Sequence, residues 1–319
     1  HMGQAEVRKV RHKMGKLERK NTLVAYSFLA PNFLGFAIFT LVPVVCAILL
    51  SLFEWNGGDL SKLKFVGLEN YANIFAVQKV AEKGIGYFFN RADLGITLKN
   101  TAYYTVVTVP LTIVCALALA ILLNKIKGAL FFRTVFFFPY VSSMVAICVC
   151  WSFMLMRNGP VNQMIMALGI DFNKGWTADS TMAMWAIILV SVWRNMGYYM
   201  VLYLAALQGI PRELMEAATV DGANKWQQFL HVTLPQLKPT TFFVSVMMVI
   251  SCFKIYDVVA IMTEGGPGRA TKMLVTYIYD EAFVKIRYGS ASAISMVLLV
   301  IVLTVTIIQF SSEKKFSND

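Results

Sequence analysis

The chain has 319 residues, of which 57% are hydrophobic and 15% charged, and its mean hydropathy is +0.61. A soluble domain carries about 25% charged residues, so the composition excludes an ordinary soluble globular protein. A net charge of +11 in a soluble protein would indicate a nucleic-acid partner, but Lys and Arg also gather on the cytoplasmic flanks of membrane spans. We therefore interpret the basic segment 1–20 as a cytoplasmic tail beside the lipid bilayer and expect no nucleic-acid partner.

The N-terminus carries two features that bear on processing. His1 precedes Met2, which we interpret as the remnant of an expression tag. The apolar run after the tail is longer than the core of a signal peptide, so we expect it to remain as a membrane anchor. The five cysteines all lie in apolar runs, and their odd number favours neither a disulfide framework nor a metal site.

Long uncharged runs predict six membrane-spanning helices, because about 20 apolar residues cross a bilayer. In chain order these are residues 21–53, 100–124, 134–156, 181–208, 239–263 and 288–312. Pro31 and Pro43 are expected to bend the first. Arg194 interrupts the fourth, and Lys254 and Asp257 lie in the later half of the fifth. Residues 21–319 are thus expected to form a single all-α transmembrane domain.

The distribution of Lys and Arg orients this bundle. Basic residues are slightly more frequent in the tail and in the loops that would share its side of the membrane, and positive charge favours the cytoplasm. This predicts that both termini lie inside. The longest outer connection, residues 54–99, is expected to include short surface helices.

The loop at residues 209–238, between the fourth and fifth predicted spans, has the signals of a short helix. Pro211 suits a first helical turn, and Glu213 and Glu216 lie near its positive end. Gly222 can adopt the left-handed conformation that ends a helix. The result is an amphipathic helix on the cytoplasmic side, which could either rest on lipid headgroups or transmit force to a soluble partner.

The same loop resembles the EAA loop of bacterial ATP-binding-cassette importer permeases. It reads Glu216-Ala217-Ala218, three residues, Gly222, nine residues, then Val232-Thr233-Leu234-Pro235, with valine where the family usually has isoleucine. Other segments look like the carbohydrate-uptake branch, and particularly like the maltose-type subunit that pairs with a second, different permease. They are residues 65–71, 100–101, 131–139, 207–211 and 263–267.

The resemblance implies a type I importer permease fold in which this loop carries a coupling helix. The residues that it implies for contact with an ATPase are Glu213, Glu216, Ala217, Ala218, Asp221 and Gly222. It also implies a second homologous permease, two cytoplasmic ATPase subunits and an extracytoplasmic solute-binding protein, in the cytoplasmic membrane of a bacterium. The chain has no glycine-rich phosphate loop ending in Gly-Lys-Ser or Gly-Lys-Thr. We therefore expect a subunit that is not an enzyme and holds no cofactor or metal, with ATP bound by its partners.

Polar residues at membrane depth predict the substrate pathway, because charge inside a bilayer is costly and is usually functional. The fourth span has a polar stripe at helical spacing, and the fifth has three polar residues toward its outer side. These candidates are Ser191, Arg194, Asn195, Tyr198, Ser251, Lys254 and Asp257. The first stripe aligns with the segment that contacts sugar in the maltose-type pattern. The same residues are equally compatible with structural roles, in which Lys254 pairs with Asp257 and Arg194 bonds to backbone.

The sequence therefore predicts the permease subunit of an ATP-driven, binding-protein-dependent importer of a sugar or oligosaccharide. If Arg194 and Lys254 face the pathway, an anionic oligosaccharide or a phosphorylated polyol is the alternative cargo. An ion-coupled secondary transporter is the alternative from another class. It is disfavoured because intramembrane carboxylates are few and no repeat relates the two halves of the chain.

Overall fold

The computed structural model describes residues 16–126 and 128–317. The expectations for the tail up to residue 15 and for His1 lie outside the described residues. The chain divides into two compact units, residues 1–49 and 50–319, and each is considered by itself. Secondary structure in the described part is helical apart from one antiparallel pair of short strands, β1 (Phe53–Glu54) and β2 (Lys64–Phe65). This agrees with the predicted all-α class.

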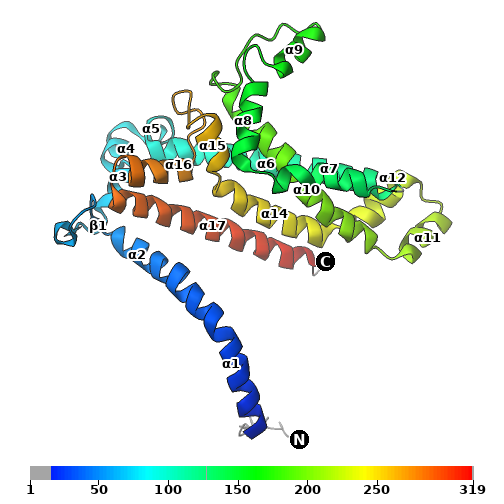
Figure 1. Cartoon of the computed structure of the whole chain (residues 1–319), viewed down its shortest axis with the longest axis horizontal. Coiled ribbons are helices and arrows are strands. Elements are labelled where there is room, and N and C mark those ends of the chain that lie inside the picture. Colours follow the sequence, from blue (N-terminus) through cyan, green and yellow to red (C-terminus); the bar gives the residue numbers. More distant parts are fainter. Residues whose placement is uncertain (1–15, 127, 318–319) are drawn as a thin grey trace, which may run out of the picture. The chain divides into compact units, whose positions relative to one another are not determined.

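The first unit is a long apolar helical segment. It contains α1 (Lys16–Phe36) and the π-helical turn η1 (Ala37–Leu41), and it continues as α2 (Val42–Leu50). Pro31 lies inside α1 and Pro43 lies in the first turn of α2. Prolines and π-helical turns are common causes of helix bending, and the segment curves as predicted (Figure 1). No residue from 24 to 50 is buried, so its apolar surface is available to lipid or to another protein.

The second unit is built on helices long enough to cross a bilayer. Three of them are continuous, namely α6 (Asp93–Asn124), α10 (Ala183–Gln208) and α17 (Tyr288–Ser317). The two others are bent pairs: α7 (Leu130–Val141) with α8 (Met144–Met154), and the α12–η3–α13 segment (Lys225–Gln236) with α14 (Lys238–Phe253). Over both units, the described residues contain four helices long and apolar enough to span a membrane, or six if each bent pair is one span.

Two predicted spans are interrupted in the structure. The third, expected to be continuous over residues 134–156, bends by 97° between α7 and α8, because the backbone leaves the helical region at Ser142 (ψ 155°) and Ser143 (ψ 123°). The fifth ends at Phe253 instead of Thr263, and a short break leads into α15 (Asp257–Met262). Hydropathy reports how apolar a segment is and does not detect where its helix breaks.

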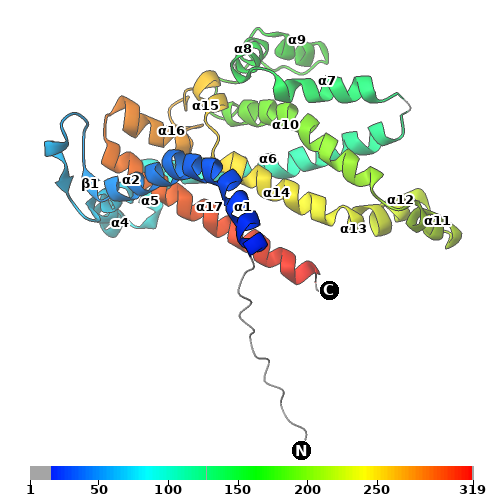
Figure 2. The same cartoon turned by 60° about the horizontal axis from the view of Figure 1, so that its bottom comes forward.

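The core of the second unit lies around α10, which packs mainly against α6 and α7. The elongated helices α6, α10, α14 and α17 lie along similar axes, with α14 running opposite to α17 (Figures 1 and 2). The close packing of α7 on α10 depends on Gly197, where an added Cβ would lie only 1.8 Å from the carbonyl oxygen of Phe136. A stripe of buried threonines runs along α6, at Thr97, Thr101, Thr105, Thr108 and Thr112.

Short helices lie outside these long elements. The first outer connection carries η2 (Leu60–Lys62), α3 (Glu69–Ile74), α4 (Val77–Lys83) and α5 (Ile85–Arg91), which confirms the prediction of short helices there. The remaining short elements are α9 (Pro160–Ala167), α11 (Arg212–Val220), α12 (Lys225–Gln228), η3 (Phe229–Thr233), α13 (Leu234–Gln236), α16 (Leu274–Tyr279) and η4 (Asp280–Val284).

Candidate functional site

A cavity of about 240 Å³ lies where α6, α8 and α10 meet the break between α14 and α15. Six of the seven residues predicted for the substrate pathway line it: Ser191, Arg194, Asn195, Ser251, Lys254 and Asp257. These residues come from two predicted spans that are far apart in the sequence. The structure therefore brings the two polar groups to one place within the bundle.

Arg194 is held in a fixed position at the wall of this cavity. Its Nη2 donates a hydrogen bond to the carbonyl oxygen of Tyr140 at 3.0 Å, as the structural interpretation of this arginine predicted. The guanidinium carbon lies 5.1 Å from the centre of the Tyr140 ring, within the range of a cation–π contact. The Nε of Arg194 is buried and has no hydrogen-bond partner among the described residues, while Arg194 as a residue lines the cavity.

Tyr198, the seventh predicted residue, does not line the cavity. It stacks on Tyr140 instead, with ring centres 4.4 Å apart and planes 16° from parallel. Tyr198 thus lies behind Tyr140, which in turn supports Arg194. The sequence placed Tyr198 on the correct helical stripe, but its partner on α7 could not be deduced from spacing within α10.

The break between α14 and α15 brings Ser251, Lys254 and Asp257 to the cavity. All three are exposed, and the described residues include no ion pair between Lys254 and Asp257, the other structural role considered for them. An unwound backbone at membrane depth is tolerated where it is buried in protein or lines a cavity. The break is therefore consistent with a polar pathway at this point.

The sequence analysis missed the aromatic part of the lining. Tyr104, Tyr199 and Tyr256 also line the cavity, and Tyr104 is only 3% exposed. A signal for Tyr104 was present in the sequence, because it belongs to the threonine-rich face of α6. A polar stripe at helical spacing inside an apolar span indicates a face that avoids lipid.

The predicted coupling loop forms a second candidate site at one end of the unit. Its helix α11 contains no buried residue. Glu213, Glu216, Ala217, Asp221 and Gly222 are exposed and Ala218 is half-buried. Apolar side chains of α11 are exposed as well, with Leu214 at 41% and Val220 at 87%. An amphipathic helix whose apolar residues have no cover is a surface suited to another protein or to lipid.

The end of α11 is a Schellman motif. Gly222 has a φ of +79° and donates its N–H to Thr219 O at 3.1 Å, while the N–H of Ala223 reaches Ala218 O at 2.9 Å. These are the two hydrogen bonds that define the motif, and they confirm that Gly222 ends the helix in the left-handed conformation. Asn224 then starts α12 with a capping box, so the direction of the chain is fixed on both sides of the turn.

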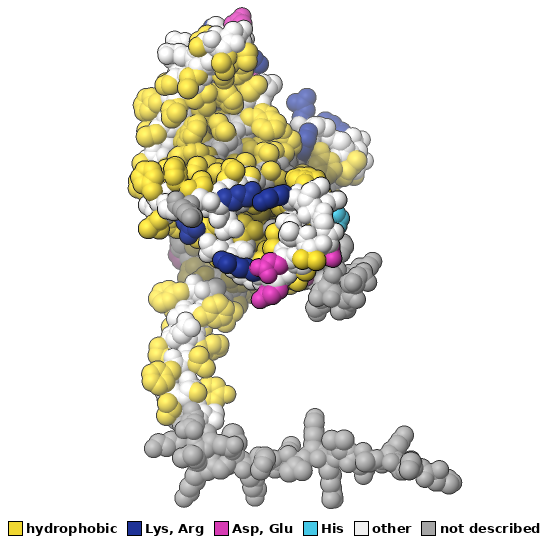
Figure 3. All heavy atoms as spheres, turned by 90° about the vertical axis from the view of Figure 1, so that its right-hand side faces the viewer, with side chains coloured by type: hydrophobic (Ala, Val, Ile, Leu, Met, Phe, Trp, Pro, Cys, Tyr) yellow, Lys and Arg dark blue, Asp and Glu magenta, His cyan; other side chains and the backbone are white. Residues whose placement is uncertain are grey.

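Charged side chains gather around this end of the second unit. Figure 3 shows dark blue Lys and Arg side chains, with acidic side chains and a histidine nearby, on the face that carries the coupling loop. After α13 the chain turns by 61° into α14, where Pro239 occupies the first helical turn. Pro239 therefore lies where the chain turns toward the next span.

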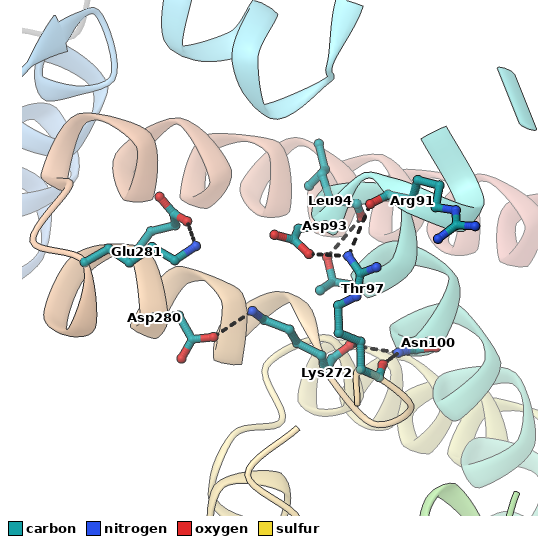
Figure 4. A network of polar contacts seen from close by, with 10 residues as sticks. Arg91, Asp93, Leu94, Thr97, Asn100, Lys272, Asp280 and Glu281 are labelled. Atoms are coloured by element: carbon teal, nitrogen blue, oxygen red, sulfur yellow. Dashed lines mark hydrogen bonds and ion pairs between the residues drawn. The ribbon is translucent and has the colours of Figure 1, made fainter. Parts of the chain in front are cut away.

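At the opposite end of α14, the loop after α15 is held by a polar network (Figure 4). Arg269 forms a 2.8 Å ion pair with Asp93, and Lys272 forms one of 2.7 Å with Asp280. The amide nitrogen of Asn100 donates to the carbonyl oxygens of both Arg269 and Lys272. The network ties the loop to the start of α6 and to η4, so the segment that follows the cavity is fixed to the outer helices.

Comparison with known proteins gives a consistent result. Residues 109–318 match the family described as "Binding-protein-dependent transport system inner membrane component". The "Probable ABC transporter permease protein YurN" of Bacillus subtilis (strain 168) is 38% identical over 295 residues, which cover 91% of this chain and 96% of that protein. The "Lactose transport system permease protein LacF" of Rhizobium radiobacter is 33% identical, with coverage of 94% and 97%.

A solved structure has a similar fold over nearly the whole length. It belongs to a bacterial ABC transporter involved in the import of the acidic polysaccharide alginate, and it matches with a TM-score of 0.77 at 21% identity. The match covers 94% of this chain and 98% of the other. At this level of identity the comparison concerns the fold.

Proposed function

Because this chain belongs to the family of binding-protein-dependent transport system inner membrane components, we propose that it forms half of the translocation pathway of a sugar importer. The other half would be a second, homologous permease. In this arrangement residues 21–319 form one permease domain of six spans with both termini inside, located in the cytoplasmic membrane of a bacterium. The chain is a permease subunit, and its ATP would be bound and hydrolysed by two separate ATPase subunits.

The coupling role is supported by α11. Its exposed apolar residues and its two acidic residues near the N-terminal end form a compact surface that can enter a cleft on another protein. The Schellman turn at Gly222 and the capping box at Asn224 fix the direction of the chain where α11 passes into α12. We propose that Glu213, Glu216, Ala217, Ala218, Asp221 and Gly222 contact the ATPase.

The sugar cargo is supported above all by one observation: residues from two separate spans converge on one polar, aromatic cavity. Hydroxyl, amide and charged side chains can exchange hydrogen bonds with sugar hydroxyls, and tyrosine rings offer faces for sugar rings. A cavity of about 240 Å³ is slightly below the roughly 300–1,000 Å³ typical of small-molecule sites. The cavity would therefore hold part of an oligosaccharide at a time. The relative named for lactose transport supports the same class of cargo.

An anionic oligosaccharide or a phosphorylated polyol is the second candidate cargo, and Arg194 is the observation that favours it. Its guanidinium is positioned by Tyr140, and Arg194 lines the cavity. Lys254 brings a second positive charge to the same cavity. A planar guanidinium binds carboxylates and phosphates well. An acidic sugar would therefore pair with the charge of Arg194, whereas a neutral sugar could only accept hydrogen bonds from it.

Both candidates can be separated with the whole transporter reconstituted in liposomes with its partner permease, ATPases and solute-binding protein. ATP hydrolysis and uptake are measured with neutral oligosaccharides, with uronate oligosaccharides and with phosphorylated polyols. Arg194→Ala should strongly reduce uptake of an acidic cargo and affect a neutral one much less. Lys99→Ala is the matched control, because Lys99 is an exposed cation of α6 outside the cavity lining. Equal uptake of every compound by wild type and Arg194→Ala would remove the anionic candidate.

The same system tests the alternative from a different class. An ATP-driven importer takes up sugar only when nucleotide and the ATPase subunits are present. An ion-coupled secondary transporter would take up sugar with this chain and its partner permease alone, under an ion gradient. Uptake that persists without nucleotide would refute the proposed function.

A further inference from the structure

A second polar pocket lies far from the membrane cavity, at the end of the second unit that carries the short helices of the first outer connection. Its volume is about 170 Å³. It is lined by the segment after β1, by α3 and by the start of α17, with Glu54, Trp55, Glu69, Asn70, Asn73 and Arg287 among its residues. None of these residues belongs to the candidate pathway or to the coupling loop.

The pocket has a rigid frame. The side-chain nitrogen of Asn70 donates to the carbonyl oxygens of Ser51 and Phe53, both at 2.9 Å, which joins α3 to the chain before it. Gly289 brings α17 close to the same point, since an added Cβ there would lie 2.0 Å from Phe53 O. Three separate segments thus meet at fixed distances, and such a frame holds side chains in position for binding.

Two of the three charged side chains in the described lining are acidic, and the buried indole Nε1 of Trp55 is a donor with no partner among the described residues. Because both hydrogens of the Asn70 amide are donated to carbonyl groups, its Oδ1 is identified as the free atom, and no described residue donates to it. Asn70 itself is only 7% exposed. The carboxylates of Glu54 and Glu69 form no ion pair within the described part of the chain, although Lys64 lies opposite Glu54 on the neighbouring strand.

Among the described residues of the lining, Arg287 is the one cation, and it already forms an ion pair. Arg287 contacts Glu281 through Nε at 3.2 Å, and Glu281, which is 3% exposed, also binds Lys285 at 2.6 Å (Figure 4). The pocket is therefore lined by the carboxylates of Glu54 and Glu69, the amide oxygen of Asn70 and the indole of Trp55. Carboxylates pair with cations, and the faces of aromatic rings attract cations, so a positively charged side chain would suit the two carboxylates and the indole face.

We propose that this pocket receives an arginine or lysine side chain of the extracytoplasmic solute-binding protein. The inference rests on the proposed function, which supplies such a partner and places the first outer connection outside. The small volume favours a single side chain over a sugar, because sites for small molecules usually measure roughly 300–1,000 Å³. Pairing of opposite charges across an interface mainly sets the rate of encounter and the choice of partner. The pocket would thus help select the correct binding protein.

The test uses the complete reconstituted transporter and measures ATP hydrolysis against the concentration of its solute-binding protein. Glu69→Gln and Glu69→Lys, alone and with the same change at Glu54, should raise the half-maximal concentration about 5-fold for the neutral change and more for the charge reversal. Glu82→Gln and Glu82→Lys are the matched controls. Glu82 is an exposed acidic residue of α4 outside the pocket, and its variants should behave like wild type.

A small probe tests the chemistry directly. N-acetyl-arginine amide should compete with the binding protein in the wild-type complex and lose this effect in Glu69→Gln, while the uncharged N-acetyl-citrulline amide should not compete. An unchanged half-maximal concentration in the Glu69 and Glu54 variants would overturn the proposal. Loss of sugar uptake with that concentration unchanged would also overturn it, and would indicate a sugar site. If no binding protein stimulates even the wild-type complex, the proposed function itself fails.

Discussion

Gly222 offers a direct test of whether α11 couples through its geometry. Its φ of +79° lies in the left-handed region, where a residue with a Cβ costs about 1–2 kcal/mol. A Cβ at this position would meet no heavy atom within 4 Å, so steric crowding adds nothing and the cost is purely conformational. If the loop can relax when free but must keep the left-handed turn when the ATPase is bound, this cost appears in the binding free energy. Gly222→Ala should then weaken ATPase binding by about 5- to 30-fold, since 1.4 kcal/mol is a factor of ten.

The assay is binding of the purified ATPase to the permease pair in nanodiscs. A graded series separates conformation from size. Gly222→Asn should bind nearly as well as wild type because asparagine tolerates the left-handed region, Gly222→Ala should bind less well, and Gly222→Val least. Gly209→Ala is the control at the other end of the loop, where φ is −82° and alanine fits the backbone.

The result also has to be independent of overall unfolding. Because Gly222 is exposed and has open space around it, strain can relax within the loop, and the thermal unfolding temperature of the bundle should stay the same. Wild-type affinity in both Gly222→Ala and Gly222→Val would refute the view that the left-handed turn positions α11. A parallel fall of affinity and unfolding temperature would refute the view that the strain stays local.

Three further predictions concern stability. Gly197→Ala should lower the yield of folded protein and its unfolding temperature in detergent, because the new Cβ would lie 1.8 Å from Phe136 O; unchanged stability would contradict this packing. Thr101→Val removes the acceptor of the buried Leu274 N–H and should cost about 1–3 kcal/mol, measured by denaturant unfolding. Hydrogen bonds from a threonine, and then a neighbouring lysine, lower the pKa of Asp179 to about 2. The stabilisation that the ionised Asp179 carboxylate gives to its loop is therefore complete above the ordinary pKa of 3.8, and it is lost as the pH falls through the lowered pKa near 2. Hydrogen exchange of its loop should distinguish wild type from Asp179→Asn at pH 6, and this difference should vanish near pH 2.

Local signals predicted much of this structure. The expected span 181–208 corresponds to α10, which begins at Ala183 and ends at Gln208, because a run of apolar residues over that length has few alternatives in a membrane. Gly222 was identified as a helix end from its residue type and its spacing alone, since the left-handed conformation favours glycine. Such features depend on a few neighbouring residues, and those residues are visible in the sequence.

Features that depend on distant partners were not predictable. The break at Ser142 and Ser143, which separates α7 from α8, comes three residues after Pro139. The helix continues through this proline, and serine is common within membrane helices, so the sequence did not show where the helix would break. The support of Arg194 by Tyr140 joins residues that are 54 positions apart. A bond from Arg194 to backbone was one of the two roles left open by the sequence, and only the packing of α7 on α10 identifies which carbonyl group accepts.

The arrangement of α10 and α14 connects the two candidate sites. The coupling loop lies between these helices in the sequence: α10 ends at Gln208 just before it, and α14 begins at Lys238 just after it. Arg194 on α10 and Ser251 on α14 both line the cavity, and each lies about 20 Å along its helix from the loop at 1.5 Å per residue. A hydrogen-bonded helix moves largely as a rigid body, so a displacement of α11 would reach both walls of the cavity at once. The break after Phe253 then lets the wall formed by α14 move while the loop beyond α15 stays fixed to α6 and η4. Under the proposed function, this geometry would let the small helix α11 open or close the polar cavity.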